Sequence, residues 1–286
     1  MSVSIKLAGI SAELKALVFD LDGTILAPGA VLTERTLKAI LSCEKKGLEI
    51  ILATGRAVEA SEKFRVPLGA VGPMVYFNGA IIADMPENKI LHTTLLAKEI
   101  AEFCVDLSQE RGIYFQMYVP GTALKPGQPL LTDRDDIQRD KYHNHTGILA
   151  ELCDLKELLR KPELPGIIKG MFLADSEILD KLRPIIETRY GKDVYVVRST
   201  STYLEVLNPG VSKGLGLGLA LDYRGIRPEE AMVFGDEEND LPMFDHAGFG
   251  VCPANAKDNV KVRADYITPS NAEDGIAVFL EEVFLR

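Results

Sequence analysis

The chain of 286 residues contains no tryptophan, only four histidines and four cysteines, and no long apolar run. No apolar stretch approaches the roughly 18 residues that a membrane-spanning helix needs. Residues 1–15 lack an apolar core of signal-peptide length. The cysteines are widely spaced and form no C-x-x-C pair, which favours reduced, mostly buried thiols in a reducing compartment. We therefore expect a cytoplasmic protein with no membrane partner.

Basic residues are also in the minority, with 32 lysines and arginines against 42 aspartates and glutamates and a net charge of -10. General nucleic-acid binders usually carry a basic face, so this balance argues against a nucleic-acid partner. The hydrophobic content of 47% is ordinary for a globular protein, and the length suffices for two domains or one large domain. The sequence does not indicate an oligomeric state.

Strand and helix signals alternate in the N-terminal part. Ala16–Phe19 and Glu49–Ala53 are short apolar runs typical of buried strands, and Thr33 is placed to cap a helix between them. Asn78-Gly79 separates two further apolar runs, 74–77 and 80–83, and this dipeptide is a strong hairpin signal.

The middle of the chain predicts a smaller α/β unit inserted into the first. The expected helices and strands are Lys98–Gln109, Ile113–Val119, Ile167–Leu173, Ile178–Tyr190 and Val194–Val197. Residues 120–129 are rich in proline and glycine, which predicts a loop, and 133–140 form a charge run typical of a solvated loop or helix face.

The last part returns to alternating signals. Ser212 is a plausible N-cap for a helix over Leu215–Ala220, and Ala231–Gly235 and Gly248–Val251 predict two more buried strands. Apolar strands separated by helices are typical of a parallel sheet that is covered on both faces. The whole pattern predicts an α/β fold with a parallel-sheet core.

Polar residues follow three of the predicted strands at once. Asp20 and Asp22 come after the first strand, Thr54 after the second, and Asp236, with Asn239 and Asp240 behind it, after 231–235. Ligands of open α/β sheets bind outside the carboxyl ends of the strands, so these groups converge if their strands are neighbours. If strand geometry persists to Asp22, both aspartates of the first group lie on one face.

The residue types in these groups indicate phosphate and metal chemistry. Asp20, Asp22 and Asp236 offer hard oxygen ligands of the kind that Mg2+ prefers. A carboxylate can also attack phosphorus and form an aspartyl-phosphate. Lys213 stands at the predicted helix start, where an ammonium beside helix N–H groups suits a phosphate. Taken one by one, each group also fits a turn, a helix cap or a solvated surface; only their joint order favours a functional site.

Two other patterns are discounted. Gly214, Gly216 and Gly218 hint at a dinucleotide loop, but the G-x-G-x-x-G spacing needs a glycine where Leu219 stands, so close helix packing is the better interpretation. His143 and His145 hint at zinc, but no partner ligands stand at a recognisable spacing, which favours a surface loop.

In this order, the polar groups resemble the motifs of the haloacid dehalogenase-like (HAD) hydrolase superfamily, and within it the Cof-like phosphatases. The four motifs are Asp20-Leu-Asp22-Gly-Thr-Ile, Ala53-Thr54-Gly55-Arg56, Gly210-Val-Ser-Lys213-Gly and Gly235-Asp236-Glu-Glu-Asn239-Asp240. Asn78-Gly79-Ala80 and Asn271-Ala-Glu-Asp-Gly275 also match the Cof-like pattern, so the resemblance covers nearly the whole chain. One departure is Cys252-Pro253, where the family usually carries Ala-Met; no catalytic role attaches to that pair.

The resemblance implies a Rossmann-like core over residues 1–84 and 205–286, with an α/β cap for substrate specificity over 85–204. It further implies a Mg2+-dependent phosphatase of small phosphorylated metabolites, working through an aspartyl-phosphate. In that scheme, Asp20 is the nucleophile and a metal ligand, and Asp22 is the general acid and base, whose backbone carbonyl reaches the metal. Asp236 is a further metal ligand, and Asp240 supports it. The phosphoryl group is held by Thr54, Gly55, Lys213 and Asn239.

Two alternatives stay open. A phosphosugar mutase of the same superfamily would pass the phosphoryl group to a second sugar hydroxyl instead of water. A non-catalytic phosphate or metal-binding protein could use the same scaffold, although a binding module has no need for Asp22 as an acid.

Overall fold

The structure, a computed structural model, describes residues 2–7, 10–121 and 127–285. It contains two compact units, Met1–His92 with Ser212–Arg286, and Thr93–Val211. The predicted insertion of a second α/β unit into the first is therefore present. Part of the proline- and glycine-rich loop expected over 120–129 lies outside the described residues. None of the helices in the described ranges combines the length and hydrophobicity of a membrane span.

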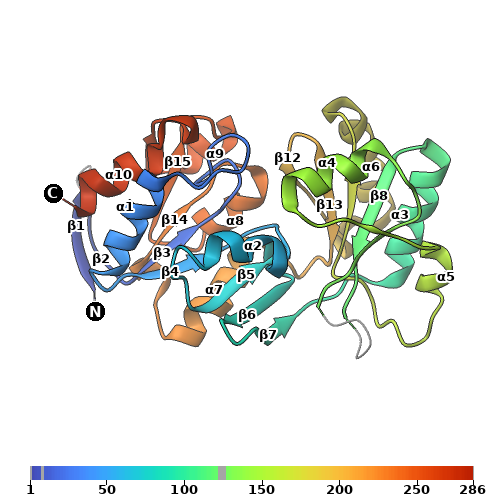
Figure 1. The fold of residues 1–286 in the computed structure, drawn as a ribbon, viewed down its shortest axis with the longest axis horizontal. Helices are drawn as coiled ribbons and strands as arrows, with labels where there is room; N and C mark the ends of the chain where they lie inside the picture. The colour runs from blue at the N-terminus through green and yellow to red at the C-terminus, as the bar shows by residue number, and fades with distance from the viewer. Residues whose placement is uncertain (1, 8–9, 122–126, 286) are drawn as a thin grey trace. The chain divides into compact units, whose positions relative to one another are not determined.

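A five-stranded parallel sheet forms the centre of the first unit (Figure 1). Its strands, in spatial order, are β16 (Tyr266–Thr268), β15 (Phe249–Pro253), β14 (Ala231–Phe234), β3 (Ala16–Phe19) and β4 (Glu49–Leu52). Every neighbouring pair in this sheet is parallel, as the alternation of buried strands and helices predicted. The α/β class with a parallel-sheet core is confirmed.

Helices cover both faces of this sheet. They are α1 (Glu34–Glu44), α2 (Val58–Arg65), α7 (Lys213–Arg224), α8 (Leu241–Phe244), α9 (Asp258–Arg263) and α10 (Gly275–Phe284). Val18 and Val233 pack on one face in a buried cluster with Leu217 of α7. The opposite face carries Phe19 stacked on Phe234, whose ring meets Phe279 of α10 edge-on. Alternating strand residues thus bury both faces, which is why these strands are apolar without a break.

Two smaller sheets complete the first unit. The hairpin of β1 (Val3–Leu7) and β2 (Ile10–Leu14) precedes β3, and a three-stranded sheet contains β5 (Gly72–Tyr76), β6 (Ile81–Met85) and β7 (Lys89–Thr93). The predicted Asn78-Gly79 hairpin joins β5 and β6 through the 3-10 turn η1 (Phe77–Gly79), in which Asn78 has a positive φ of 57°. Hairpin β1–β2 and strand β7 were not predicted.

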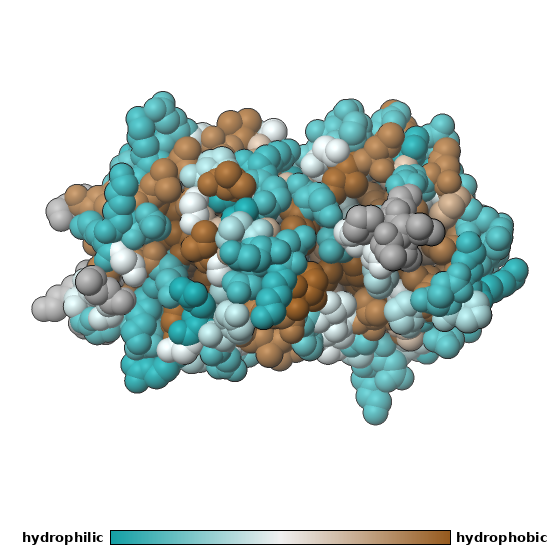
Figure 2. Space-filling view, turned by 60° about the horizontal axis from the view of Figure 1, so that its bottom comes forward, coloured by the Kyte–Doolittle hydropathy of each residue, from teal (hydrophilic) through white to brown (hydrophobic). Residues whose placement is uncertain are grey.

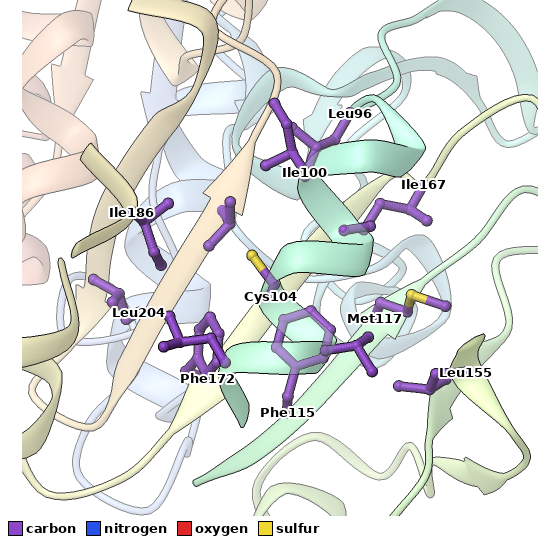
Figure 3. Close-up of a cluster of buried hydrophobic side chains, with 14 of the residues drawn as sticks. Leu96, Ile100, Cys104, Phe115, Met117, Leu155, Ile167, Phe172, Ile186 and Leu204 are labelled. Carbon is purple, nitrogen blue, oxygen red and sulfur yellow. The ribbon is translucent and has the colours of Figure 1, made fainter. Parts of the chain in front are cut away.

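The second unit is a six-stranded mixed sheet with helices. The sheet order is β10 (Glu151–Leu152), β9 (Leu130–Thr132), β8 (Tyr114–Tyr118), β11 (Lys169–Leu173), β13 (Tyr203–Leu207) and β12 (Tyr195–Thr200). The helices are α3 (Lys98–Arg111), α4 (Ile137–Thr146), α5 (Leu155–Leu159) and α6 (Ser176–Tyr190). Side chains of α3, α6 and the strands form one apolar cluster (Figure 3), which includes Ile100, Phe172 and Leu204.

The other face of this sheet carries buried polar side chains. Lys169 of β11 and Glu205 of β13 form an ion pair of 2.7 Å between Nζ and Oε2, with each side chain 2% exposed. Tyr118 of β8 shares a 3.0 Å hydrogen bond with Tyr142 of α4. Polar groups on an inner face need such partners, because a lone buried charge is costly.

The chain passes from one unit to the other at positions that differ from the domain limits drawn from the sequence. The limits of the compact units fall at 92/93 and 211/212, whereas the sequence led us to expect 84/85 and 204/205. The difference arises because β7 lies in a sheet of the first unit, whereas β13 pairs with β11 and β12 of the second. The role of the second unit as a specificity cap stays a prediction.

The segment around His143 and His145 was predicted as a surface loop and belongs instead to helix α4. Asp136 caps the helix by accepting a hydrogen bond from the backbone N–H of Gln138, and Gly147 ends it with a left-handed backbone. The buried pair Tyr142 and Thr146, four residues apart, anchors it. Both histidines lie outside any group of possible metal ligands among the described residues.

The glycines of α7 allow close packing, as predicted. A side chain at Gly214 would meet the carbonyl oxygen of Pro242 at 2.2 Å, and one at Gly216 would meet Val75 at 2.7 Å. A Cβ at Gly218 would only touch His246, at 3.8 Å, so Gly218 is not needed for this close packing.

Hydrophilic residues cover much of the surface in Figure 2, with hydrophobic ones in patches between them.

Candidate active site

The three strands that carry the polar groups are neighbours in the order β14, β3, β4. Asp20 follows β3, and its backbone N–H donates to the carbonyl of Phe234 in β14. Thr54 follows β4, and its N–H donates to the carbonyl of Val75, which joins this edge to β5. Because parallel strands end at one edge, the predicted convergence at the carboxyl end of the sheet follows from this register.

Lys213 reaches into this edge from the first residue of α7. Ser212 caps the helix by accepting a hydrogen bond from the N–H of Leu215, as predicted. The Lys213 Nζ lies 2.5 Å from Oδ1 of Asp20 and 2.6 Å from Oδ1 of Asp240, and the side chain is 1% exposed. An ammonium so deeply buried between two carboxylates is not a solvated surface lysine.

Asp240 and Asp236 are fixed by the turn that follows β14. Oδ2 of Asp240 accepts hydrogen bonds from the backbone N–H groups of Asp236 and Glu237, at 2.9 and 3.0 Å. Oδ1 of Asp236 accepts one from the hydroxyl of Thr24 at 2.7 Å. Gly23 makes room for this carboxylate, because a Cβ there would lie 2.2 Å from Oδ2 of Asp236.

Asp20, Asp236 and Asp240 form the one group of three or more candidate metal ligands among the described residues. One carboxylate oxygen from each lies within 4.8 Å of the others. Lys213 supplies a single positive charge against these three carboxylates, so two negative charges are left if all are ionised. Within the described part of the chain, the side-chain hydrogen bonds of Asp20 and Asp236 each use one carboxylate oxygen. This donor set fits a divalent cation with hard oxygen ligands.

Burial dominates the electrostatics of the cluster. It raises the pKa of Asp20 to about 7, with Lys213 acting in the opposite direction and the charges of Asp240 and Asp22 adding to the rise. Burial, together with Asp20 and Asp240, also raises the pKa of Asp236 well above its usual range. For Lys213, burial alone would lower the pKa, but Asp20 and Asp240 raise it above the ordinary value. A bound cation would favour the ionised carboxylates.

Asp22 lies apart from this cluster. Strand β3 ends at Phe19, so the strand geometry that would put Asp20 and Asp22 on one face does not persist. The Asp22 carboxylate instead receives two hydrogen bonds of 2.6 Å from the guanidinium of Arg56. The two aspartates therefore have separate partners: an ammonium for Asp20 and a guanidinium for Asp22.

The predicted phosphate ligands stand at the same edge. The hydroxyl of Thr54, which is buried, accepts a hydrogen bond from the N–H of Arg56 at 3.1 Å, with Gly55 between them. Asn239 lies in the 3-10 turn η4 (Glu238–Asp240), which leads into the short helix α8, and its Nδ2 donates to Oδ1 of Asn78 at 2.9 Å. The Oδ1 of Asn239 is buried with no hydrogen-bond partner among the described residues.

Three residues of this site were not singled out from the sequence: Arg56, Thr24 and Asn78. Each lies inside one of the motifs given above, so the sequence marked its position as part of a motif. Only the fold shows which side chain or backbone group it contacts. The Asn271–Gly275 motif also gains a physical reason: Asn271 donates to the carbonyl of Leu26, and Asp274 accepts from Thr33. These bonds tie the motif to the turn after β3 and to the N-cap of α1.

Comparisons with known proteins agree with this geometry. A family model described as haloacid dehalogenase-like hydrolase matches residues 17–280. The chain is 27% identical over 277 residues to 5-amino-6-(5-phospho-D-ribitylamino)uracil phosphatase YitU of Bacillus subtilis (strain 168), covering 94% of this chain and 97% of the relative. It is 28% identical over 283 residues to the phosphatase YwtE of the same organism, which carries the same substrate in its name, with 94% and 98% covered.

Solved structures share the fold over nearly the full length. TM0651 from Thermotoga maritima has a TM-score of 0.77 and 28% identity, covering 94% of this chain and 97% of that one. A haloacid dehalogenase-like hydrolase from B. subtilis has a TM-score of 0.81 at 22% identity, with 94% and 99% covered. The family model spans the residues that build the carboxylate cluster. The chain therefore belongs to the haloacid dehalogenase-like hydrolase family, which confirms the resemblance of its motifs, and it is an enzyme of that class.

Proposed function

We propose that the protein is a Mg2+-dependent phosphatase that hydrolyses small phosphate monoesters through an aspartyl-phosphate on Asp20. The buried ammonium of Lys213 between Asp20 and Asp240 carries this proposal. A lysine that served packing alone would not need three carboxylates around the edge where parallel strands end. A positive group beside a carboxylate nucleophile suits a reaction in which a phosphoryl group brings negative charge.

In the first half-reaction, an oxygen of Asp20 attacks phosphorus and the bond to the leaving oxygen breaks. Asp22 gives its proton to that oxygen, and the alcohol departs. In the second half-reaction, Asp22 takes a proton from water, whose oxygen attacks phosphorus, and the phosphate leaves Asp20 as a free carboxylate. Lys213, Thr54, Gly55 and Asn239 would hold the phosphoryl oxygens by their N–H and O–H groups.

Asp20 and Asp236, with the backbone carbonyl of Asp22, would hold the Mg2+ ion, and Asp240 would support them. The ion would supply positive charge that offsets the carboxylates and the incoming phosphoryl group. The observation that supports a divalent ion is the group of three carboxylates around a single ammonium, because a bound cation would favour their ionised forms. The choice of Mg2+ follows from the all-oxygen donor set, without sulfur or imidazole.

The substrate class follows from the relatives. Several are named as phosphatases of 5-amino-6-(5-phospho-D-ribitylamino)uracil, a small phosphorylated metabolite. The second unit, predicted as a specificity cap, would select among such metabolites. We propose small phosphate monoesters, among them sugar phosphates and phosphorylated cofactor precursors, as the substrates.

Phosphatase activity should depend on a divalent metal. The purified protein should release inorganic phosphate from p-nitrophenyl phosphate and from members of a metabolite panel that includes the ribitylaminouracil phosphate. EDTA should abolish release, and excess Mg2+ should restore it, because the ion would favour the ionised carboxylates of the cluster, and Asp20 must be ionised to attack phosphorus. Isomerised sugar phosphate without phosphate release would identify a mutase, and Mg2+ binding without turnover would identify a binding protein; either contradicts the proposal.

A second prediction separates the roles of the two aspartates. Asp22→Asn should slow breakdown of the phosphoenzyme more than it weakens Mg2+ binding. The side-chain amide cannot accept a proton from water, whereas the backbone carbonyl of residue 22, which would bind the ion, is unchanged. Rapid-quench kinetics give the rate of breakdown, and a Mg2+ titration gives the affinity. Unchanged hydrolysis of the trapped intermediate would rule out Asp22 as the base.

A further inference from the structure

The contact between Arg56 and Asp22 is a two-point ion pair. Nε of Arg56 donates to Oδ2 of Asp22, and one terminal nitrogen donates to Oδ1, both at 2.6 Å. Two parallel bonds of this kind fix the plane of the carboxylate as well as its position. A single-point contact would leave the carboxylate free to rotate about its bond to Cβ.

Arg56 is the rigid partner of this pair. Its side chain is 4% exposed, against 25% for Asp22. Its backbone N–H donates to the Thr54 hydroxyl, and its carbonyl accepts from the N–H of Phe77, the first residue of η1 after β5. The guanidinium lies 5.2 Å from the ring centre of Phe64 in α2. The arginine is therefore held by the loop after β4, by η1 and by α2 before any ligand arrives.

Asp22 differs from the other three acidic side chains of the edge. Among the described residues, the candidate metal ligands gather in one group that includes Asp20, Asp236 and Asp240 but not Asp22. Its partial exposure leaves it open to a ligand, whereas Asp240 is fully buried. Arg56 thus holds the Asp22 carboxylate beside the other three carboxylates but outside their cluster.

We infer that Arg56 is a positioning residue that acts through Asp22 and fixes the carboxylate for proton transfer. This inference rests on the proposed function. A general acid or base works only within hydrogen-bond reach of its target, and misplacement by about 1 Å can cost about a hundredfold in rate. Lysine could supply the same charge, but its point-like ammonium cannot fix the carboxylate plane.

The test compares Arg56→Ala, Arg56→Lys and Asp22→Asn, alone and combined. Arg56→Ala and Arg56→Lys should each lower kcat about 10- to 100-fold with little change in KM, since the geometry of proton transfer is lost and phosphate binding is kept. In the Asp22→Asn background, Arg56→Ala should change kcat by less than about twofold, because two residues that act as one unit are not additive. Rapid-quench kinetics should place the loss in the proton-transfer steps.

Arg35→Ala is the matched control, because it breaks another two-point arginine–carboxylate pair, with Glu281, in the same unit. It should leave kcat unchanged, and circular dichroism should show that all variants are folded. Full activity in Arg56→Lys would show that charge alone suffices and would overturn the inference. A raised KM, or a further loss of kcat in the Asp22→Asn background, would show that Arg56 binds the phosphate directly. If the wild-type enzyme is active, these outcomes reject only the inference; an inactive wild-type enzyme would reject the proposed function and the inference with it.

Discussion

Asp20→Asn should abolish turnover while the protein stays folded. The amide lacks the anionic oxygen that attacks phosphorus, so kcat for p-nitrophenyl phosphate should fall by at least about a thousandfold. The fold should tolerate the change, because a neutral amide avoids the burial of a charge that raises the pKa of Asp20. The neutral amide also removes repulsion from Asp240 and Asp22 and keeps an oxygen that can accept from Lys213.

Activity assays at saturating substrate, together with thermal unfolding followed by circular dichroism, check this prediction. Asp222→Asn is the control: Asp222 is an exposed residue of α7, and its replacement should leave kcat unchanged. An intact mass should exclude hydrolysis of the new amide back to aspartate. A folded Asp20→Asn variant that keeps a tenth or more of the wild-type kcat, about 1.4 kcal/mol in barrier height, would refute Asp20 as the nucleophile.

Lys213→Met should lower both activity and stability. Methionine fills much of the space of lysine but leaves the buried carboxylates of Asp20 and Asp240 without their shared cation. Removing one partner of a buried ion pair typically lowers the free energy of unfolding by about 3–5 kcal/mol. Loss of a positive group from the phosphoryl site should lower kcat on the order of a hundred- to a thousandfold.

Urea unfolding without Mg2+ measures the free energy of unfolding of the variant and of the wild type. Added Mg2+ should recover part of the stability that the variant has lost, because the ion restores positive charge to the cluster. Lys38→Met is the control, since Lys38 pairs with Glu34 on the surface with 72% of its side chain exposed. Such a pair contributes about 1 kcal/mol or less, so this variant should match the wild type in both measurements. A Lys213→Met enzyme with kcat within twofold of the wild type would remove the lysine from the mechanism.

The sequence was sufficient to predict the edge at which the site lies. Apolar runs that end at Phe19, Ala53 and Gly235 marked three buried strands, and the rule that ligands bind at the carboxyl ends of parallel strands brought their polar residues together. This prediction depended on one condition, that the three strands are neighbours, and the structure fulfils it by placing β14, β3 and β4 side by side.

The pairing of the charges could not be predicted. Whether Asp22 faces the metal cluster or Arg56 depends on where β3 ends and on the loop after β4, which sequence periodicity does not resolve. Asp22 and Arg56, 34 positions apart, meet only because β3 and β4 end at the same edge of the sheet. Asn78 and Asn239, which lie 161 positions apart, likewise come into contact only in the folded chain.

The second unit was predicted less completely. Strands β9 and β10 have three and two residues, too short for an alternating pattern to appear. Helix α4 was hidden by its polar sequence, and only its cap at Asp136 and its end at Gly147 reveal it. The buried pair of Lys169 and Glu205 resembles surface charges in the sequence, because its burial depends on the register of β11 against β13.

The most direct test of the account is to locate the covalent phosphate. Asp22→Asn enzyme, mixed with Mg2+ and p-nitrophenyl phosphate, whose leaving group can depart without a proton from Asp22, and quenched in acid after milliseconds to seconds, should carry one phosphoryl group. Mass spectrometry of its peptides should place that group on Asp20. The same treatment of Asp20→Asn should yield none. Phosphate on another residue, or turnover of substrate with no covalent phosphate at any time, would contradict the central claim that Asp20 receives the phosphoryl group.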